Sequence, residues 1–518
     1  MIHINAGLPF TLGIFIGFFS FGITEAAGQK TDSATVSYGK PNIVLILCDD
    51  LGYGDVQCLN PTRGKIKTPS VDKLAAEGMI FTDAHSGSSV CTPTRYGLLT
   101  GRYSWRTKLQ RGVVQGFAPN LIVEDRPTVA SFLKAQGYHT GIIGKWHLNF
   151  QYVDPATGTP MKKLRKKAPA PVGSTIPDGP VQRGFDYFHG FHHAGSMKCV
   201  IENEKVIAHD DQINMLPRLT RKAVDFIDER STEKEKPFFL YVPFGSPHTP
   251  ILPTKEWQGK SGLGDYADFV MQTDAGVGAI TDALERNGFA DNTLVIFSSD
   301  NGCSKAANFK RLESRGHFAS AHMRGSKADI WDGGHRIPFI VRWPGKVTPD
   351  SSSDQLICLT DFFATFSELI GKPLPADCAE DSVSILPALS GKPIVSSRAG
   401  VIHHSIDGHF AYRQGKWKLC LAKGSGGWSA PKEEDVPADA PKAQLYDLEK
   451  DPGEITNLYT TQPEVVERLL KQLEADVMGG RSTEGSPSKN DAEIDLWKLN
   501  AAERGKNSRK QKEEANGK

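Results

Sequence analysis

The segment Asn42-Ile43-Val44-Leu45-Ile46-Leu47 is a continuous apolar run, and Cys48-Asp49-Asp50 follow it directly. A run without polar alternation is typical of a strand that lies buried on both faces of a parallel sheet. Similar short apolar runs recur at residues 141–144, 238–242, 293–297 and 337–341. Because helix-like segments separate these runs, the pattern predicts an α/β fold around one sheet.

Helix signals support this interpretation. Residues 127–136 begin with a Pro suited to a first helical turn and end before Gly137, and residues 265–286 carry apolar side chains near helical spacing. Beyond about residue 395 the pattern changes to short hairpin-like pieces, followed by a predicted helix at 463–477. We therefore predict a main domain over 40–395 and a smaller α+β C-terminal subdomain over 396–480.

Composition narrows the function classes. The chain has 518 residues with 61 Lys+Arg against 60 Asp+Glu, so binding of nucleic acid driven by net positive charge is not expected.

The end of the chain, 481–518, is polar and charged, and we predict that it is disordered. A basic run at 162–167 lies in an insertion; it predicts either recruitment of a polyanionic substrate or a solvated loop without a partner.

The N-terminus indicates export. Residues 7–23 are apolar, and the small residues Ala26 and Ala27 suit cleavage of a secretory signal peptide over residues 1–27. An uncleaved anchor and a buried helix remain as alternatives. No later stretch is apolar and long enough to predict a membrane span. The eight Cys residues are scattered and contain no CxxC pair, so neither a disulfide scaffold nor a structural zinc site is predicted.

Oxygen-bearing side chains follow two of the predicted strands. Asp49 and Asp50 come after the first strand, and Asp300 and Asn301 come after the run at 293–297. Binding sites of open α/β sheets form at the carboxyl ends of strands, and oxygen ligands without His or Cys suit a hard cation such as Ca²⁺. Either pair alone would more simply close a strand with a polar turn. Together they predict a cation site, because paired acids would otherwise repel one another.

Cys91-Thr92-Pro93-Thr94-Arg95 places a Cys just before a Pro that suits a first helical turn. A helix N-terminus lowers the pKa of a thiol and favours nearby anions. An isolated CxPxR would be a buried Cys at a helix start, so the residues around it decide its meaning.

These surroundings resemble a known family. The segments are PNIVLILCDDLGYGD from Pro41, CTPTRYGLLTGR from Cys91, GKWHL from Gly144, PFGSPHTP from Pro243, SSDNG from Ser298 and RGSKADIWDGGHRIP from Arg324. In this order they resemble the type I sulfatases of the alkaline phosphatase superfamily, over roughly residues 40–480. The resemblance implies a mixed, mostly parallel central sheet flanked by helices, and a sulfuric ester hydrolase that takes a sulfated small molecule or glycan.

The resemblance also implies a cofactor set. A separate maturation enzyme oxidises the Cys of this motif to formylglycine in the family, and Cys91 is the matching position. One Ca²⁺ is implied, held by Asp49, Asp50, Asp300, Asn301 and the modified Cys91. The hydrate of an aldehyde offers two hydroxyls on one carbon: one attacks sulfur, and loss of the proton from the other expels sulfate.

The resemblance also implies roles for further residues. Lys145 and Lys327 match the two sulfate-binding lysines, and Arg95 matches the residue that orients the nucleophile. His147 is the implied base and His248 the implied donor to the leaving alcohol. In an extended chain, Lys145 and His147 would point to one face. Without the family, a surface Lys and a hydrogen-bonded His beside Trp146 would be the simpler interpretation.

Two other functions stay open at this level. A phosphonate or phosphate monoester hydrolase of the same superfamily shares the nucleophile and the metal ligands. A catalytically silent protein that keeps the fold, binds sulfated glycans and retains Cys91 as an unmodified thiol is the second alternative. The long polar loop between Asn301 and Lys327, which includes Arg311, Arg315, His317 and Arg324, is expected to be able to make substrate contacts of its own.

Overall fold

The computed structural model describes residues 39–162, 168–395 and 397–498. The predicted signal peptide, five residues of the basic run and the tail beyond 498 lie outside the described residues. Contacts group the described residues into one compact unit, and the boundary between a main domain and a C-terminal subdomain at residue 395 stays a prediction. Among the described residues, no helix combines the length and the apolar character needed to cross a membrane.

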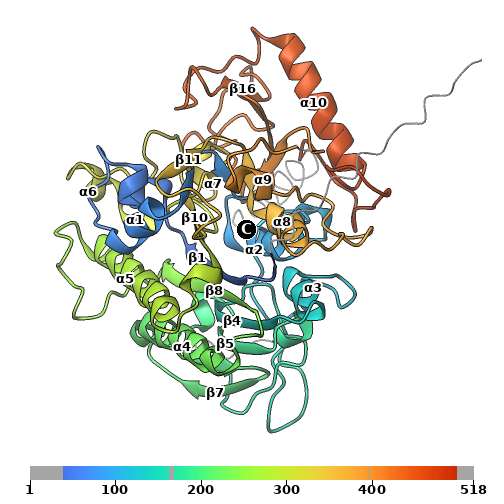
Figure 1. Cartoon of the computed structure of the whole chain (residues 1–518). Coiled ribbons are helices and arrows are strands. Elements are labelled where there is room, and N and C mark those ends of the chain that lie inside the picture. Colours follow the sequence, from blue (N-terminus) through green and yellow to red (C-terminus); the bar gives the residue numbers. More distant parts are fainter. Residues whose placement is uncertain (1–38, 163–167, 396, 499–518) are drawn as a thin grey trace, which may run out of the picture. The chain divides into compact units, whose positions relative to one another are not determined.

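A ten-stranded sheet forms the centre of the fold (Figure 1). Its strands, in spatial order, are β11 (Ser351–Ser353), β2 (Met79–Phe81), β10 (Phe339–Arg342), β9 (Thr293–Ser299), β1 (Asn42–Asp49), β8 (Phe238–Pro247), β4 (His139–Lys145), β5 (Tyr187–Phe191), β6 (Cys199–Glu202) and β7 (Lys205–His209). The five predicted apolar runs are β1, β4, β8, β9 and β10, and they all lie in this sheet.

The middle of the sheet is parallel, and an antiparallel pair adjoins it on each side. Strands β9, β1, β8, β4 and β5 run parallel to their neighbours, whereas β10 and β6 pair antiparallel at either side. In the register, Ile46 of β1 lies between Val242 of β8 and Phe297 of β9. Every residue of β1 is buried, as expected of a strand covered on both faces. The predicted mixed, mostly parallel sheet is confirmed.

Alternate residues of β1 point to two separate cores. Ile43, Leu45 and Leu47 belong to a core with residues of α2 (Cys91–Thr100), α3 (Val129–Ala135) and α8 (Phe362–Leu369). Val44, Ile46 and Cys48 belong to the other, with residues of α1 (Pro69–Ala76), α4 (Met215–Arg230) and α5 (Asp265–Arg286). The apolar run at 42–47 therefore forms a strand because both of its faces are covered by helices.

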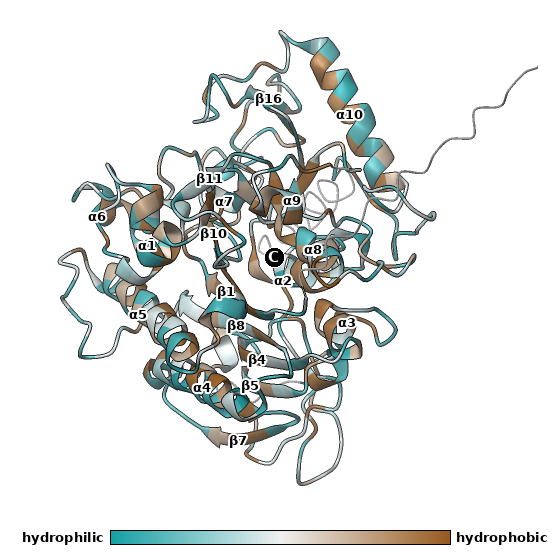
Figure 2. Ribbon diagram, viewed as in Figure 1, coloured by the Kyte–Doolittle hydropathy of each residue, from teal (hydrophilic) through white to brown (hydrophobic). Residues whose placement is uncertain are grey.

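The C-terminal part adds a second, smaller sheet. It is antiparallel and consists of β13 (Val401–His404), β14 (Phe410–Gln414), β15 (Trp417–Cys420) and β16 (Gln444–Asp447). Helix α10 (Pro463–Met478) lies beside it in Figure 1, and the mixed brown and teal of α10 in Figure 2 matches a helix with one buried face. The remaining elements are short: β3 (Ala84–His85), β12 (Ile357–Cys358), α6 (Phe309–Glu313), α7 (Asp332–His335) and α9 (Leu386–Leu389).

The prediction of a disordered tail from residue 481 is wrong for residues 481–498. Buried Arg102 donates through Nη2 to Asp491 Oδ1 and to Lys489 O, each at 2.9 Å. Ile494 and Leu496 are buried in the core of the C-terminal sheet. The composition argument failed here because partners elsewhere in the fold compensate for the few apolar residues of the segment.

Candidate active site

Four neighbouring strands of the sheet end at one edge, and each carries polar residues just beyond or at its last position. The strands β9, β1, β8 and β4 lie side by side in this order. Their ends lead to Asp300 and Asn301, to Asp49 and Asp50, to His248, and to Lys145 and His147, respectively. The parallel direction of the four strands therefore gathers residues that are distant in the sequence, such as Asp50 and Asn301, which lie 251 positions apart.

The two acidic pairs lie next to each other, as predicted. The backbone N–H of Asp50 donates to Asp300 Oδ1 at 3.2 Å, and Asn301 Nδ2 donates to Asp50 Oδ1 at 2.8 Å. Asp50 has a φ of 65°, so the chain turns sharply after β1 and brings its carboxylate back toward β9. All four side chains are buried.

Cys91 is the first residue of α2, with Pro93 in the first turn, as the sequence predicts. Its Sγ and carboxylate oxygens of Asp49 and Asp300 lie within 4.8 Å of one another. The side chain is only 3% exposed. Burial raises the pKa of the Cys91 thiol, although the ammonium groups of Lys145 and Lys327 oppose this. The expected lowering of the thiol pKa by the helix N-terminus is therefore wrong, because loss of solvent outweighs it.

Arg95 lies one helical turn after Cys91 and connects three strands. Its Nε and Nη2 donate to Asp300 Oδ2 at 3.0 and 2.8 Å, and its Nη1 donates to the carbonyl oxygen of Lys145 at 3.0 Å. Arg95 Nη2 also lies 3.8 Å from Asp49 Oδ2. A fully buried guanidinium with these partners fixes α2 against the ends of β9, β1 and β4.

Two lysines complete the cationic side of the site. Lys145 Nζ donates to Asp49 Oδ2 at 2.5 Å, and Lys327 Nζ lies 2.6 Å from Asp50 Oδ1. Burial alone would lower the pKa of Lys327. The attractions of the surrounding groups, of which the Asp50 carboxylate contributes most, together outweigh burial and raise the pKa, so the ammonium stays charged. The backbone N–H of Lys327 donates to Cys303 O at 2.9 Å, which ties its loop to the end of β9.

The two predicted histidines differ in exposure. His147 is buried with its Nδ1 unpaired, its Nε2 lies 3.0 Å from Val114 O, and burial holds its pKa well below the ordinary value. Its φ of 57° shows that β4 ends before it, so the extended geometry predicted for Lys145 and His147 is wrong. His248 Nε2 lies 3.7 Å from Asp50 Oδ2, with 18% of the side chain exposed, and burial lowers its pKa.

The carboxylates at this edge of the sheet form a group that could hold a cation. Burial raises the pKa of Asp300, and repulsion from Asp49 adds to this. Burial also opposes ionisation of Asp49, but Lys145, His248 and Arg95 hold the pKa of that carboxyl well below its ordinary value. Asp49 Oδ1 and Asn301 Oδ1 are buried and accept no hydrogen bond. Unpaired buried oxygens are costly in a protein, and they are the ligands that a hard cation prefers.

Sequence reasoning missed a neighbouring pair of histidines. The rings of His192 and His193 lie with their centroids 5.9 and 5.7 Å from the ring of His147. They follow β5, the next parallel strand beyond β4, so the same strand-end rule would have found them. In the loop expected to contact substrate, His317 Nε2 instead lies 2.8 Å from buried Asp55, and Arg324 stacks on Trp331.

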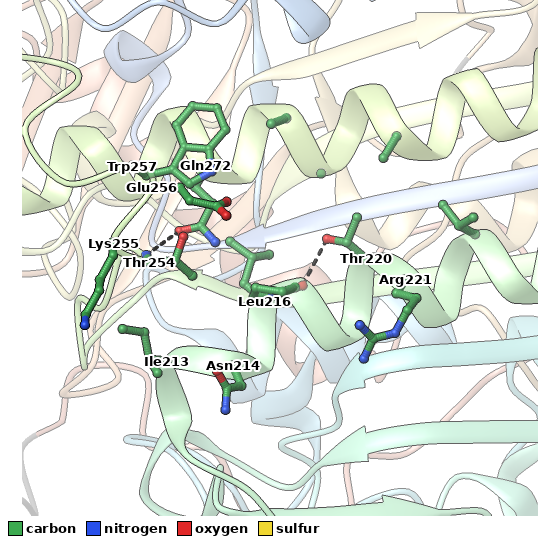
Figure 3. A pocket seen from close by; sticks show the side chains of 15 residues that line it. Ile213, Asn214, Leu216, Thr220, Arg221, Thr254, Lys255, Glu256, Trp257 and Gln272 are labelled. Carbon is green, nitrogen blue, oxygen red and sulfur yellow. Dashed lines mark hydrogen bonds between the residues drawn. The ribbon is translucent and has the colours of Figure 1, made fainter.

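A cavity of about 720 Å³ lies elsewhere, between α4, α5 and residues 254–257 (Figure 3). Its lining includes Arg221, Trp257 and Gln272, and Gln272 Oε1 accepts the N–H of Thr254 at 2.9 Å. None of the residues gathered around Cys91 lines it.

The sequence profile of the family named Sulfatase matches residues 41–372, which span all of the strand ends described above. The chain belongs to the sulfatase family. It is therefore a sulfuric ester hydrolase, and the predicted family and reaction class are confirmed. The predicted roles of the individual site residues remain predictions.

Several relatives cover most of this sulfatase. It is 33% identical to the N-acetylgalactosamine-6-O-sulfatase of Bacteroides thetaiotaomicron, over 84% of this chain and 93% of that protein. It is 31% identical to human arylsulfatase A, over 84% and 87% of the two chains. A solved structure from a glycosaminoglycan-metabolism locus of B. thetaiotaomicron superposes with a TM-score of 0.73 at 31% identity, over 85% of this chain and 99% of that one.

Proposed function

We propose that this sulfatase hydrolyses O-sulfate esters of carbohydrates, through a formylglycine made from Cys91 and with one bound Ca²⁺. The observation that carries the proposal is the position of Cys91, at the start of α2 and against the carboxylates of Asp49 and Asp300. The relative that acts on N-acetylgalactosamine 6-O-sulfate supports a carbohydrate substrate.

The donor set fits Ca²⁺. Asp49, Asp50, Asp300, Asn301 and the modified Cys91 would hold the ion, and the unpaired Asp49 Oδ1 and Asn301 Oδ1 would gain a partner. When bound, the ion supplies Lewis acidity toward a sulfate oxygen and offsets the charge of the carboxylates. Arg95 keeps Asp300 and the start of α2 in place for this arrangement.

The protonation state of the Cys91 thiol supports the conversion of this residue to formylglycine. A buried thiol with a raised pKa stays protonated near neutral pH, and a protonated thiol is a weak nucleophile. The hydrated aldehyde avoids this difficulty, because one hydroxyl attacks sulfur while the other can lose its proton to expel sulfate. A maturation enzyme is therefore a required partner, and it must act before Cys91 is buried by folding.

The remaining side chains have two roles, anion binding and proton transfer. Lys145 and Lys327 bring two positive charges to a site that must hold a monoanionic ester. His147 stays neutral, and its unpaired Nδ1 is ready to accept a proton. His248 is partly exposed, so it lies on the side from which an alcohol can leave and can donate to the departing oxygen. Export through a signal peptide at residues 1–27 remains part of the proposal.

The test is a panel of sulfated mono- and oligosaccharides with free sulfate as the readout, for an enzyme produced together with a formylglycine-generating partner. Cys91→Ala should abolish release, whereas Cys58→Ala changes a cysteine outside the site and should retain it. Phosphate esters of the same sugars test the alternative that the enzyme is a phosphohydrolase and not a sulfatase. Equal release by the Cys91→Ala variant, or release from phosphate esters alone, would overturn the proposal.

A further inference from the structure

A segment of the C-terminal part lies directly against the loop that carries Lys327. The N–H of Ile330 donates to Ser425 O at 2.8 Å, so residues 425–429 run alongside residues 326–330. At Gly427 the two backbones are so close that an added Cβ would lie 2.2 Å from Ala328 O. Only a glycine allows this approach without displacement of the residue next to Lys327.

One buried carboxylate joins the two segments. Asp329 Oδ1 accepts the N–H groups of Trp428 and Ser429, each at 2.9 Å, and its other oxygen accepts the N–H of Ser326 at 2.9 Å. The hydroxyl of Ser429 donates to the same carboxylate. Asp329 is fully buried, so these hydrogen bonds fix the backbone of Trp428 relative to the Lys327 loop.

The side chain of Trp428 is exposed although its backbone is fixed. Its exposed fraction is 41%, while many other large aromatic residues, including Trp105, Trp146 and Trp331, are fully buried. In the part of the chain that the structure describes, no aromatic ring or cationic side chain packs on the Trp428 indole. Lys305, two residues beyond Cys303, donates to the Trp428 carbonyl oxygen and adds a further tether.

We propose that Trp428 is a stacking platform for a sugar ring of the substrate, next to the sulfate site. The inference rests on the proposed function, because it assumes a carbohydrate substrate. The C–H-rich face of a pyranose is apolar, and an indole offers it a large, rigid surface at little cost in conformational entropy. Because Asp329 fixes the Trp428 backbone against the loop that carries Lys327, the platform would favour an alcohol large enough to reach from the sulfate site to the indole.

The platform makes a defined kinetic prediction. A ring stacked equally in the bound substrate and in the transition state adds uniform binding, so its loss raises KM and leaves kcat unchanged. For Trp428→Ala we expect KM for a sulfated oligosaccharide to rise roughly tenfold, which corresponds to about 1.4 kcal/mol. Trp428→Phe keeps an aromatic face and should restore most of the affinity.

Two controls separate this effect from damage to the sulfate site. Inorganic sulfate carries no sugar, so its inhibition constant as a competing product should be the same in Trp428→Ala and in the parent. Trp257→Ala removes a tryptophan that lines the cavity between α4 and α5, with Lys260 over its ring at 4.3 Å, and should leave KM unchanged.

The outcomes are distinguishable. If the parent releases no sulfate from any saccharide, the proposed function fails. If the parent is active on saccharides but Trp428→Ala has an unchanged KM, or Trp428→Phe is as impaired as Trp428→Ala, the platform is overturned and the proposed function stands. A higher inhibition constant for inorganic sulfate in Trp428→Ala would show that the residue supports the Lys327 loop instead, and would also overturn the platform.

Discussion

Removal of one carboxylate from the proposed cation site should abolish stabilisation by Ca²⁺. Asp49→Asn preserves the shape of the side chain but removes its charge, while Asp49 Oδ1 in the parent is buried without a hydrogen-bond partner. An unpaired buried acceptor costs about 1–3 kcal/mol. Ca²⁺ that binds there should therefore stabilise the folded chain, and the Asn variant should bind it far more weakly.

The expected shift of the melting temperature on Ca²⁺ binding follows from mass action. A ligand at 100 times its dissociation constant stabilises a protein by about 2.7 kcal/mol. Unfolding entropy of about 2.1 cal/mol/K per residue, for the roughly 480 residues of the compact unit, gives about 1 kcal/mol per degree. The melting temperature of the parent should thus rise by about 3 °C between chelator and saturating Ca²⁺.

Thermal unfolding with and without Ca²⁺ measures this directly. The parent and the control Asp186→Asn, whose carboxylate pairs with Lys134, should show the full rise, and Asp49→Asn should show little or none. A rise of the same size in Asp49→Asn would refute the assignment of the ligands. So would metal analysis that finds stoichiometric zinc in the active enzyme.

Three further predictions concern single residues. Cys91→Ser supplies one hydroxyl where two are needed, so a rapid-quench assay should show at most a single burst of alcohol; sustained turnover would contradict the mechanism. His248→Ala should slow hydrolysis more for a sugar sulfate than for an activated aryl sulfate, because a good leaving group needs no proton; equal losses would limit His248 to binding. Burial raises the pKa of Asp476 to about 6, so its folded form is protonated at a pH where the unfolded carboxyl is ionised, and stability is lost as pH rises through that value. Asp476→Asn should therefore raise the melting temperature near pH 8 by the equivalent of roughly 2–3 kcal/mol and have little effect near pH 4. An equal effect at both pH values would refute this explanation.

The strand ends could be predicted because they depend on local pattern and one topological rule. Buried parallel strands are apolar throughout, so residues 42–47 reveal β1, and polar residues just after such strands meet at one edge of the sheet. This reasoning placed Asp49 beside Asp300. The identity of Cys91 as a reacting residue came from the resemblance, since burial and spacing alone describe an ordinary helix start.

The features that the sequence did not predict depend on long-range contacts, which no local pattern encodes. The tail at 481–498 is ordered by Arg102 and Arg106, whose partners lie more than 380 residues away in the sequence. The backbone of His147 adopts a positive φ because β4 ends at Lys145, and the spacing of the two residues gave no sign of this. The position of the Trp428 backbone against Asp329, in the loop that carries Lys327, is likewise a long-range contact without a local signal in the sequence.

The most direct test of the proposed mechanism is the mass of the peptide that contains Cys91, measured on active enzyme. If the nucleophile derives from Cys91, the thiol is replaced by an aldehyde, and the fraction of converted peptide is proportional to the rate of sulfate release across preparations. Fully active enzyme whose Cys91 is an unmodified thiol would contradict it.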